Sequence, residues 1–240
     1  MCLVAISLHA SKFPLVIAAN RDEDYDRPTL PAAFWPDAPE ILGGRDGLQG
    51  GTWLAVTRDG RFAAVTNLRG SEREPGKRSR GELVSEFVLG HTPAVQYLKD
   101  VAPRAHEYAG FHLLAGSADE VVLLSGSVMR LADGIHALSN APAGERWPKV
   151  DEARAAIAGL ATIDDAQEMV ESVLQFLATR RGTGHVENEV FVAGERYGTR
   201  SSTAIVITPE HELFFAEQSY ERGGVRDGET RRFRFTIGAP

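Results

Sequence analysis

Cys2 combines a strong nucleophile with a position next to the initiator methionine, and it is the only cysteine of the sequence. If Met1 is removed, Cys2 carries a thiol and a free α-amine on one residue. In unperturbed peptides the amine titrates at about 7.7–8.0 and the thiol at about 8.5. A nucleophile and a proton acceptor would then share one position, as covalent catalysis by cysteine requires. The alternative is that Cys2 is a small apolar residue opening a buried strand, since free cysteine is commonly buried.

Two apolar runs would position Cys2 beside a group of polar residues. The runs Cys2–Leu8 and Leu15–Asn20 are short and rich in Val, Ile and Leu at both parities, which predicts two strands buried on both faces. The short link between them predicts an antiparallel hairpin. Because the start of the first strand then lies beside the end of the second, we expect Cys2 close to residues 20–22.

Arg21 and Asp22 have side chains that would complement a thiolate and an ammonium group. A nearby cation lowers the pKa of a thiol, so Arg21 would favour the thiolate, and Asp22 would orient the ammonium. On a strand, however, Arg21 points away from the face shared by Asn20 and Asp22. The alternative is therefore that Arg21 stabilises a loop and not the thiolate.

Five blocks, in this order and spacing, resemble the signature blocks of the NRDE family, which is the transport and Golgi organisation 2 family: NRDE at 20–23, GGTWLAV at 50–56, AAVTNLR at 63–69, HALSNAPAGERWPKV at 136–150 and YGTRSSTAIVI at 197–207. The resemblance runs nearly from end to end and implies a single family domain over residues 1–240. The family in turn resembles N-terminal-nucleophile hydrolases of the cysteine type, such as penicillin V acylase and bile salt hydrolase. This second resemblance implies a four-layer αββα sandwich.

The candidate catalytic residues are Cys2, Arg21, Asp22, Asn67, Asn140 and Arg200. The resemblance to these hydrolases implies the roles of the two asparagines, and the arginines are candidates because of their charge. Asn67, at the end of a predicted strand, would donate to an oxyanion, and its alternative is the capping of a turn. Asn140 would contact the region of the cysteine. Arg200 would bind an anion or the thiolate, with a surface salt bridge as the alternative. The chain departs from the hydrolases at Ala19, because their arginine precedes the asparagine of this segment.

Four residues are candidates for ligand binding: Asn20, Trp35, Trp53 and Arg69. Trp35 belongs to the proline-rich segment Asp24–Pro39, for which we expect an extended surface loop. The tryptophan would either form the wall of a pocket or pin this loop to the core. Arg69 opens the basic run 69–80, which is either a solvated loop or a flap that meets an anionic ligand, such as a lipid phosphate or a haem propionate.

The composition narrows the classes of function. A net charge of −7 over 240 residues argues against a general nucleic-acid binder. One cysteine excludes an internal disulfide, and the seven histidines form no HExxH pair, so no metal centre is expected. The sequence contains no apolar run of about eighteen residues and no signal-peptide pattern, so we expect no transmembrane segment and a cytoplasmic location.

The periodicity of apolar residues predicts strands and helices in separate groups, which is an α+β layering. Beyond the hairpin, strands are expected at 40–43, 52–57, 62–66, 111–115, 120–124, 128–131, 134–139, 199–207, 213–217 and 232–237. Helices are expected at 81–89, at 93–108 with a kink at Pro103, from 147 to about 160, and from about 165 to 179. Asp165 and Glu168 form the pattern of a capping box at the start of the last helix.

Two functions from different classes fit these residues. The first is a hydrolase, in which Cys2 attacks an amide or thioester of a hydrophobic acyl group and no cofactor is required. The second is a binding protein of the same shape, because the family is associated with haem trafficking and with lipid or acyl-CoA homeostasis. In both cases the partner is a small hydrophobic anion, and in the second case haem would be a bound ligand held by Cys2 or a histidine.

Overall fold

The computed structural model describes residues 2–71, 76–141 and 145–238. Contacts divide these residues into two compact units. Unit 1 comprises residues 2–26, 132–141 and 145–237, and unit 2 comprises the described residues of 27–131 together with Gly238. The single domain over residues 1–240 stays a prediction.

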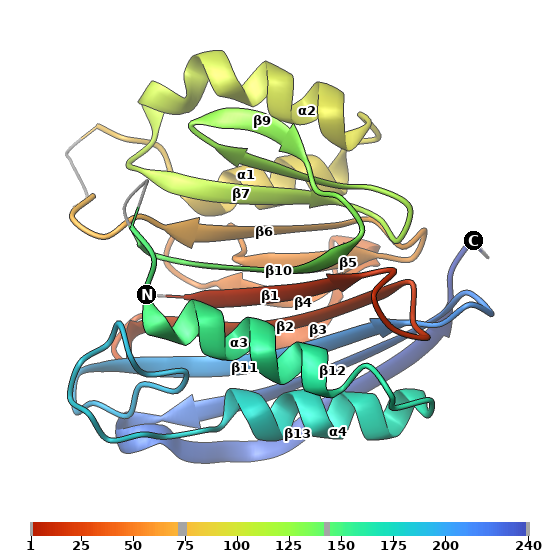
Figure 1. Ribbon diagram of the computed structural model, residues 1–240. Helices are drawn as coiled ribbons and strands as arrows, with labels where there is room; N and C mark the ends of the chain where they lie inside the picture. The colour runs from red at the N-terminus through yellow and green to blue at the C-terminus, as the bar shows by residue number, and fades with distance from the viewer. Residues whose placement is uncertain (1, 72–75, 142–144, 239–240) are drawn as a thin grey trace. The chain divides into compact units, whose positions relative to one another are not determined.

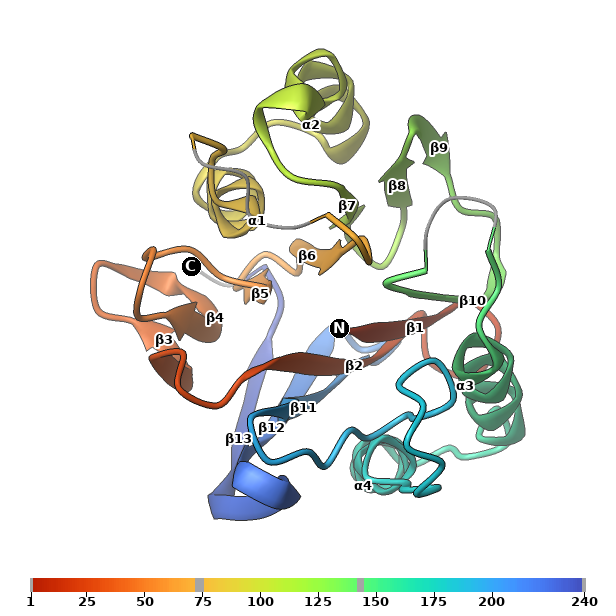
Figure 2. The same cartoon turned by 90° about the vertical axis from the view of Figure 1, so that its left-hand side faces the viewer.

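Unit 1 is built on an antiparallel sheet with the strand order β10-β1-β2-β11-β12-β13 (Figure 1). Its strands are β1 (Leu3–Leu8), β2 (Leu15–Asp24), β10 (Gly134–Ser139), β11 (Tyr197–Ile207), β12 (Glu212–Glu221) and β13 (Val225–Thr236). The helices α3 (Pro148–Gly159) and α4 (Ala166–Leu177) cover one face of this sheet, as both views show (Figures 1 and 2). A short 3₁₀ turn, Arg222–Gly224, joins β12 to β13.

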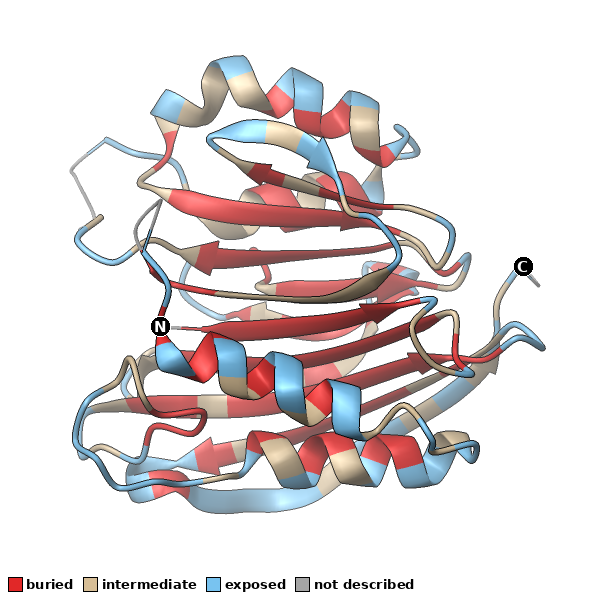
Figure 3. Ribbon diagram, in the orientation of Figure 1, coloured by how far each residue is buried: buried red, intermediate tan, exposed pale blue. Residues whose placement is uncertain are grey.

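The core of unit 1 lies between this sheet face and the two helices. Leu3 and Ala5 of β1 and Val16 and Ala18 of β2 belong to the same apolar cluster as the buried side chains of both helices, with α3 packed on β1 and α4 on β2. Figure 3 shows this division, with buried residues along one side of each helix and exposed residues along the other. Each buried Val or Leu side chain contributes roughly 1.5–3 kcal/mol to stability. The hairpin and both helices are therefore held together mainly by apolar contact.

Unit 2 is a meander in which the strands pair in chain order. The strands are β3 (Thr29–Trp35), β4 (Ala38–Asp46), β5 (Leu54–Thr57), β6 (Phe62–Asn67), β7 (Phe111–Gly116), β8 (Val121–Ser125) and β9 (Ser127–Arg130). The helices α1 (Arg80–Leu89) and α2 (Ala94–Val101) pack on this sheet, and a 3₁₀ helix, Ala102–Glu107, follows α2. No helix in the described part of the chain is long and apolar enough to cross a membrane.

The elements differ from the sequence prediction at two prolines. The segment 24–39 was expected to be a surface loop, but it contains β3, with Pro31 inside the strand. β3 is an edge strand with register shifts, where a proline costs no ladder hydrogen bond. The expected kinked helix at 93–108 is instead α2 followed by the 3₁₀ helix that contains Pro103. The predicted cap of α4 is present, because the Asp165 side chain accepts a hydrogen bond of 2.8 Å from the backbone nitrogen of Glu168.

Candidate active site

The hairpin of β1 and β2 places Cys2 opposite Arg21. The two strands pair with Leu3 opposite Asn20, and the same register carried one residue further sets Cys2 against Arg21. Residues directly opposite each other on antiparallel strands project from the same face, and successive residues alternate. Arg21 therefore shares the face of Cys2, whereas Asn20 and Asp22 lie on the face of Leu3 and the helices.

The alternation predicted from the sequence separates Arg21 from Asn20 and Asp22, and the structure has this arrangement. It does not separate Arg21 from the thiol, however, because the register of β1 and β2, extended one residue beyond Leu3, puts Cys2 on the face of the arginine. Both side chains are buried, and the Arg21 guanidinium forms an ion pair with Glu23, with 3.8 Å between Nη2 and Oε2. The role of Arg21 at the thiolate stays a prediction.

Asn140 contacts the backbone of Cys2 from the other neighbouring strand. β1 pairs with β10 with Leu3 opposite Ser139, so Asn140 follows directly beside Cys2. The Asn140 side chain is fully buried, and its Oδ1 accepts a hydrogen bond from the backbone nitrogen of Cys2. This nitrogen is the atom that would become the α-amine if Met1 were removed.

Asp22 is a buried carboxyl group close to the same end of the sheet. Its Oδ1 accepts a hydrogen bond of 2.7 Å from the Thr199 hydroxyl of β11. Burial raises the pKa of the Asp22 carboxyl, while the charges of Lys149 and Arg21 and the hydrogen bond from Thr199 oppose this rise. The pKa of this carboxyl, which lies near the N-terminus, is therefore higher than that of an ordinary aspartate.

Arg200 lies at an irregularity of β11, where the pairing with β2 shifts register between Thr199 and Ser201. Bulges of this kind often re-aim a side chain near a functional site. The Arg200 guanidinium donates to the backbone carbonyls of Asp24, at 3.3 Å, and Tyr25, at 2.6 Å. These bonds hold the chain that leaves β2, and the anion-binding role of Arg200 stays a prediction.

Four further candidates, Asn67, Trp35, Trp53 and Arg69, belong to unit 2. Asn67 is the last residue of β6 and pairs with Phe111, and its role as oxyanion donor stays a prediction. Trp35 is a core residue: its ring is buried, and its Nε1 donates to the carbonyl of Gly43 at 3.0 Å. Trp53 is half-buried and Arg69 is exposed. The basic run that Arg69 opens includes residues 72–75, which lie outside the described residues.

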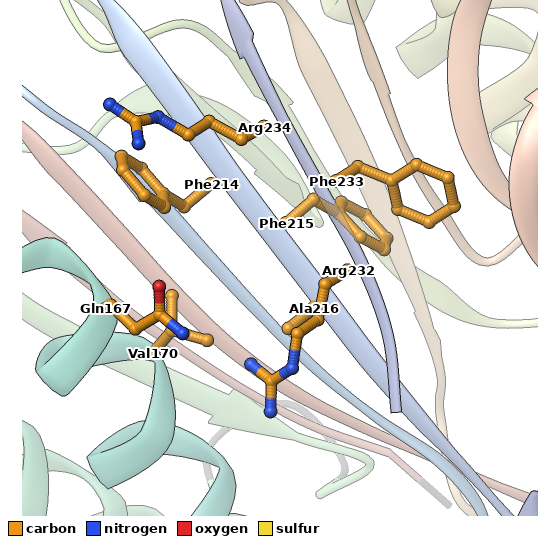
Figure 4. A pocket seen from close by; sticks show the side chains of 8 residues that line it. All are labelled: Gln167, Val170, Phe214, Phe215, Ala216, Arg232, Phe233 and Arg234. Carbon is orange, nitrogen blue, oxygen red and sulfur yellow. The ribbon is translucent and has the colours of Figure 1, made fainter. Parts of the chain in front are cut away.

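A small pocket in unit 1 lies between α4 and the strands β12 and β13 (Figure 4). Its volume is about 140 Å³, below the range of roughly 300–1,000 Å³ that is usual for small-molecule sites. Two arginines at its rim pair with carboxylates, Arg232 with Glu171 at 2.6 Å and Arg234 with Glu212 at 2.7 Å. The pocket therefore offers neither the room nor the uncommitted charge that a large hydrophobic anion needs.

A family model described as Transport and Golgi organisation 2 matches residues 1–222. The chain belongs to this family. It is 31% identical over 267 residues to the mouse (Mus musculus) Transport and Golgi organization 2 homolog, covering 94% of this chain and 93% of the relative. It is 26% identical over 260 residues to the Drosophila melanogaster Transport and Golgi organization protein 2, covering 91% and 92%.

Solved structures give the fold of this family member. Two variants of the conjugated bile acid hydrolase from Clostridium perfringens match it with a TM-score of 0.55, at 11% and 10% identity. The matches cover 97% and 98% of this chain and 92% and 98% of the hydrolase chains. At such low identity the likeness concerns the fold alone, and it confirms the predicted class, an α+β fold of the αββα N-terminal-nucleophile hydrolase type.

Other site features of this family member were not predicted from its sequence. Lys149, in the first turn of α3, is fully buried, and the charges of Asp22 and Cys2 act on it. The sequence pointed to Lys149 only through its position inside the block at 136–150, one of the five blocks that resemble the family.

Among the described residues, no group of three or more His, Cys, Asp or Glu side chains could hold a metal ion.

Asn20 joins three segments around the site through its side-chain amide. Its Nδ2 donates to the carbonyls of Leu177, at the end of α4, and Val190, both at 2.8 Å. Its Oδ1 accepts a hydrogen bond of 2.6 Å from the Ser202 hydroxyl of β11. The amide is thus committed to holding β2 against a helix end and a loop, and ligand binding by Asn20 stays a prediction.

We expect Asn20→Ala to lower the free energy of unfolding by about 3 kcal/mol, because two buried carbonyls and a hydroxyl lose their partner. Urea unfolding followed by circular dichroism measures this change. Ser202→Ala is the matched control, since it removes only one of the three bonds and should cost about 1 kcal/mol. An equal, small effect of both variants would contradict the joining role of Asn20.

Proposed function

We propose that this protein is a cysteine N-terminal-nucleophile hydrolase that cleaves amide or thioester bonds of hydrophobic acyl compounds. The observation that supports this most is the hydrogen bond between the backbone nitrogen of Cys2 and the buried side chain of Asn140. Removal of Met1 would convert this nitrogen into a free amine that already has an acceptor beside it. The fold shared with a conjugated bile acid hydrolase supports the same class of reaction.

In the proposed reaction the α-amine of Cys2 takes the thiol proton, and Sγ attacks the acyl carbonyl carbon. The tetrahedral intermediate collapses when the leaving amine or thiol takes the proton from the ammonium, which leaves an acyl thioester on Cys2. Water then gives a proton to the same amine and attacks the thioester carbonyl. The carboxylic acid is released as Sγ recovers that proton. No cofactor takes part.

Two neighbours of Cys2 would support these steps. Asp22 would stabilise the ammonium that forms when the amine accepts a proton, and Arg21 would stabilise the thiolate from the opposite strand position. Asn67 stays the predicted donor to the oxyanion. The alternative function is a carrier of haem, lipid or acyl-CoA on the same fold, without catalysis. For both functions we propose a cytoplasmic location.

The test uses protein whose intact mass shows that Met1 is absent. We expect incubation with fatty-acyl thioesters and amides, followed by an acid quench, to give an acyl adduct on the N-terminal peptide together with steady release of the thiol or amine. Titration with haem and with a non-hydrolysable acyl-CoA runs in parallel. Tight binding of either ligand with no adduct and no release would overturn the hydrolase and favour the carrier.

A further inference from the structure

Lys149 is a buried lysine whose ammonium group has no hydrogen-bond partner among the described residues. It is 0% exposed, and its Nζ makes no hydrogen bond to any residue that the structure describes. The Lys149 Nζ lies over the ring of Trp147, 5.5 Å from the ring centroid. Lysine is almost never fully buried without a partner, so this position calls for a physical reason.

The start of α3 brings Lys149 to the end of the sheet that carries Cys2. α3 packs on β1 and β10, and Figure 1 shows that the helix begins beside the start of β1. The apolar cluster of Ala141, Trp147 and Val150 fixes the helix start against the segment that follows β10. That segment also carries Asn140, the residue that binds the backbone nitrogen of Cys2.

Four acidic neighbours of Lys149 favour its ammonium form, against the effect of burial. Burial lowers the pKa of Lys149, and the negative charges of Asp22, Cys2, Glu187 and Glu189 act in the opposite direction. Glu189 is held as a carboxylate: burial raises its pKa, but hydrogen bonds from the backbone and hydroxyl of Thr183 and from the backbone of Arg181 outweigh this and lower it.

The influence of Lys149 on Asp22 is mutual, because the charge of Lys149 also lowers the pKa of the Asp22 carboxyl. In their charged forms the two groups attract each other, while burial opposes both charges, because it raises the pKa of Asp22 and lowers the pKa of Lys149. Such a pair is weak evidence for stability, since the desolvation of two charges offsets much of their attraction. An effect on the ionisation of a neighbouring group, the Cys2 thiol, gives a better reason for burying Lys149 and Asp22 here.

We propose that Lys149 is a positioning residue for Cys2: its buried ammonium fixes the Asp22 carboxylate beside the N-terminus and favours the thiolate of Cys2 over the thiol. A cation close to a cysteine stabilises the thiolate, which is the nucleophilic form. The same charge disfavours the ammonium form of a freed α-amine, so the amine stays ready to accept a proton. The catalytic value of this arrangement rests on the proposed hydrolase function, whereas the charge effect on the thiol does not.

The experiment measures the titration of the Cys2 thiol, which is unambiguous because the chain has a single cysteine. Thiolate ultraviolet absorbance and the rate of alkylation by iodoacetamide are recorded against pH for wild type and Lys149→Met. We expect the midpoint to rise by about one pH unit in Lys149→Met, with an approximately tenfold slower alkylation at neutral pH. Lys149→Arg, which keeps the charge, should retain the wild-type midpoint. Lys12→Met, which removes an exposed lysine of the same unit, should leave it unchanged.

An unchanged midpoint in folded Lys149→Met would show that the lysine is merely structural and would overturn the inference. If circular dichroism shows that this variant does not fold, Lys149→Gln replaces it. A wild-type midpoint at or above about 8.5, the value of an unperturbed thiol, would overturn the inference without any variant. If the midpoint of the Cys2 titration depends on Lys149 but no acyl adduct forms, the proposed hydrolase function is wrong and the role of Lys149 stands. If an acyl adduct forms but the midpoint is the same in wild type and Lys149→Met, the role of Lys149 is wrong and the hydrolase function stands.

Discussion

Replacing Cys2 by alanine is expected to lower kcat/KM for the best acyl thioester by about 10⁴-fold or more. The proposed reaction runs through a thioester on Sγ, and removing the nucleophile of such a site leaves only the rate that binding and electrostatic stabilisation supply. The measurement is thiol release under conditions in which wild type turns over many times. The acyl adduct on the N-terminal peptide should disappear in the same variant.

Cys2→Ser is the matched control for the shape of the site, because it keeps a hydroxyl where the thiol was. A hydroxyl ionises far less readily than a thiol, so we expect Cys2→Ser to be nearly as inactive as Cys2→Ala. Cys2 is a small side chain, and thermal unfolding of both variants should resemble that of wild type. Turnover that survives in either variant would mean that another group performs the chemistry.

The hairpin, and with it the position of Cys2 beside residues 20–22, could be predicted from the sequence. Two short runs that are apolar at both odd and even positions leave few other arrangements. Asn140 was a candidate because of the resemblance to the hydrolases; the strand pattern alone showed only that this residue follows a predicted strand. The relation between Cys2 and Arg21 could be predicted only in part. Alternation along β2 separated Arg21 from Asp22, but the face of Cys2 depended on the register with β1, which pairs Leu3 with Asn20.

Lys149 and the strand β3 show what periodicity does not reveal. A lysine in the first turn of a helix usually lies in solvent, and its burial here depends on segments far away in the sequence, including the carbonyl of Glu187 that accepts its backbone hydrogen bond at 3.3 Å. The proline-rich segment 24–39 was expected to be a loop, but it contains the edge strand β3. An edge strand tolerates Pro31 because one side of its backbone needs no hydrogen-bond partner. Both outcomes are set by tertiary contacts that local sequence does not encode.

Protein that keeps Met1 is expected to hydrolyse acyl thioesters about 10²- to 10⁴-fold more slowly than protein that begins at Cys2, because it lacks the proton acceptor. In the longer form the nitrogen of Cys2 belongs to a peptide bond, which can donate to Asn140 but is not basic. In the shorter form the amine can donate to Asn140 and still use its lone pair for the thiol proton. The thiol itself is the same in both forms.

The comparison uses two preparations that differ only in Met1, separated and verified by intact mass, with kcat/KM measured for the same thioester. Alkylation by iodoacetamide is the control, since both forms should consume one equivalent at their single cysteine. Equal turnover of the two forms would show that the α-amine is not the base. A thiol that is alkylated in both forms but turns over only in the shorter one locates the missing group at the amine, because no other atom of the two proteins differs.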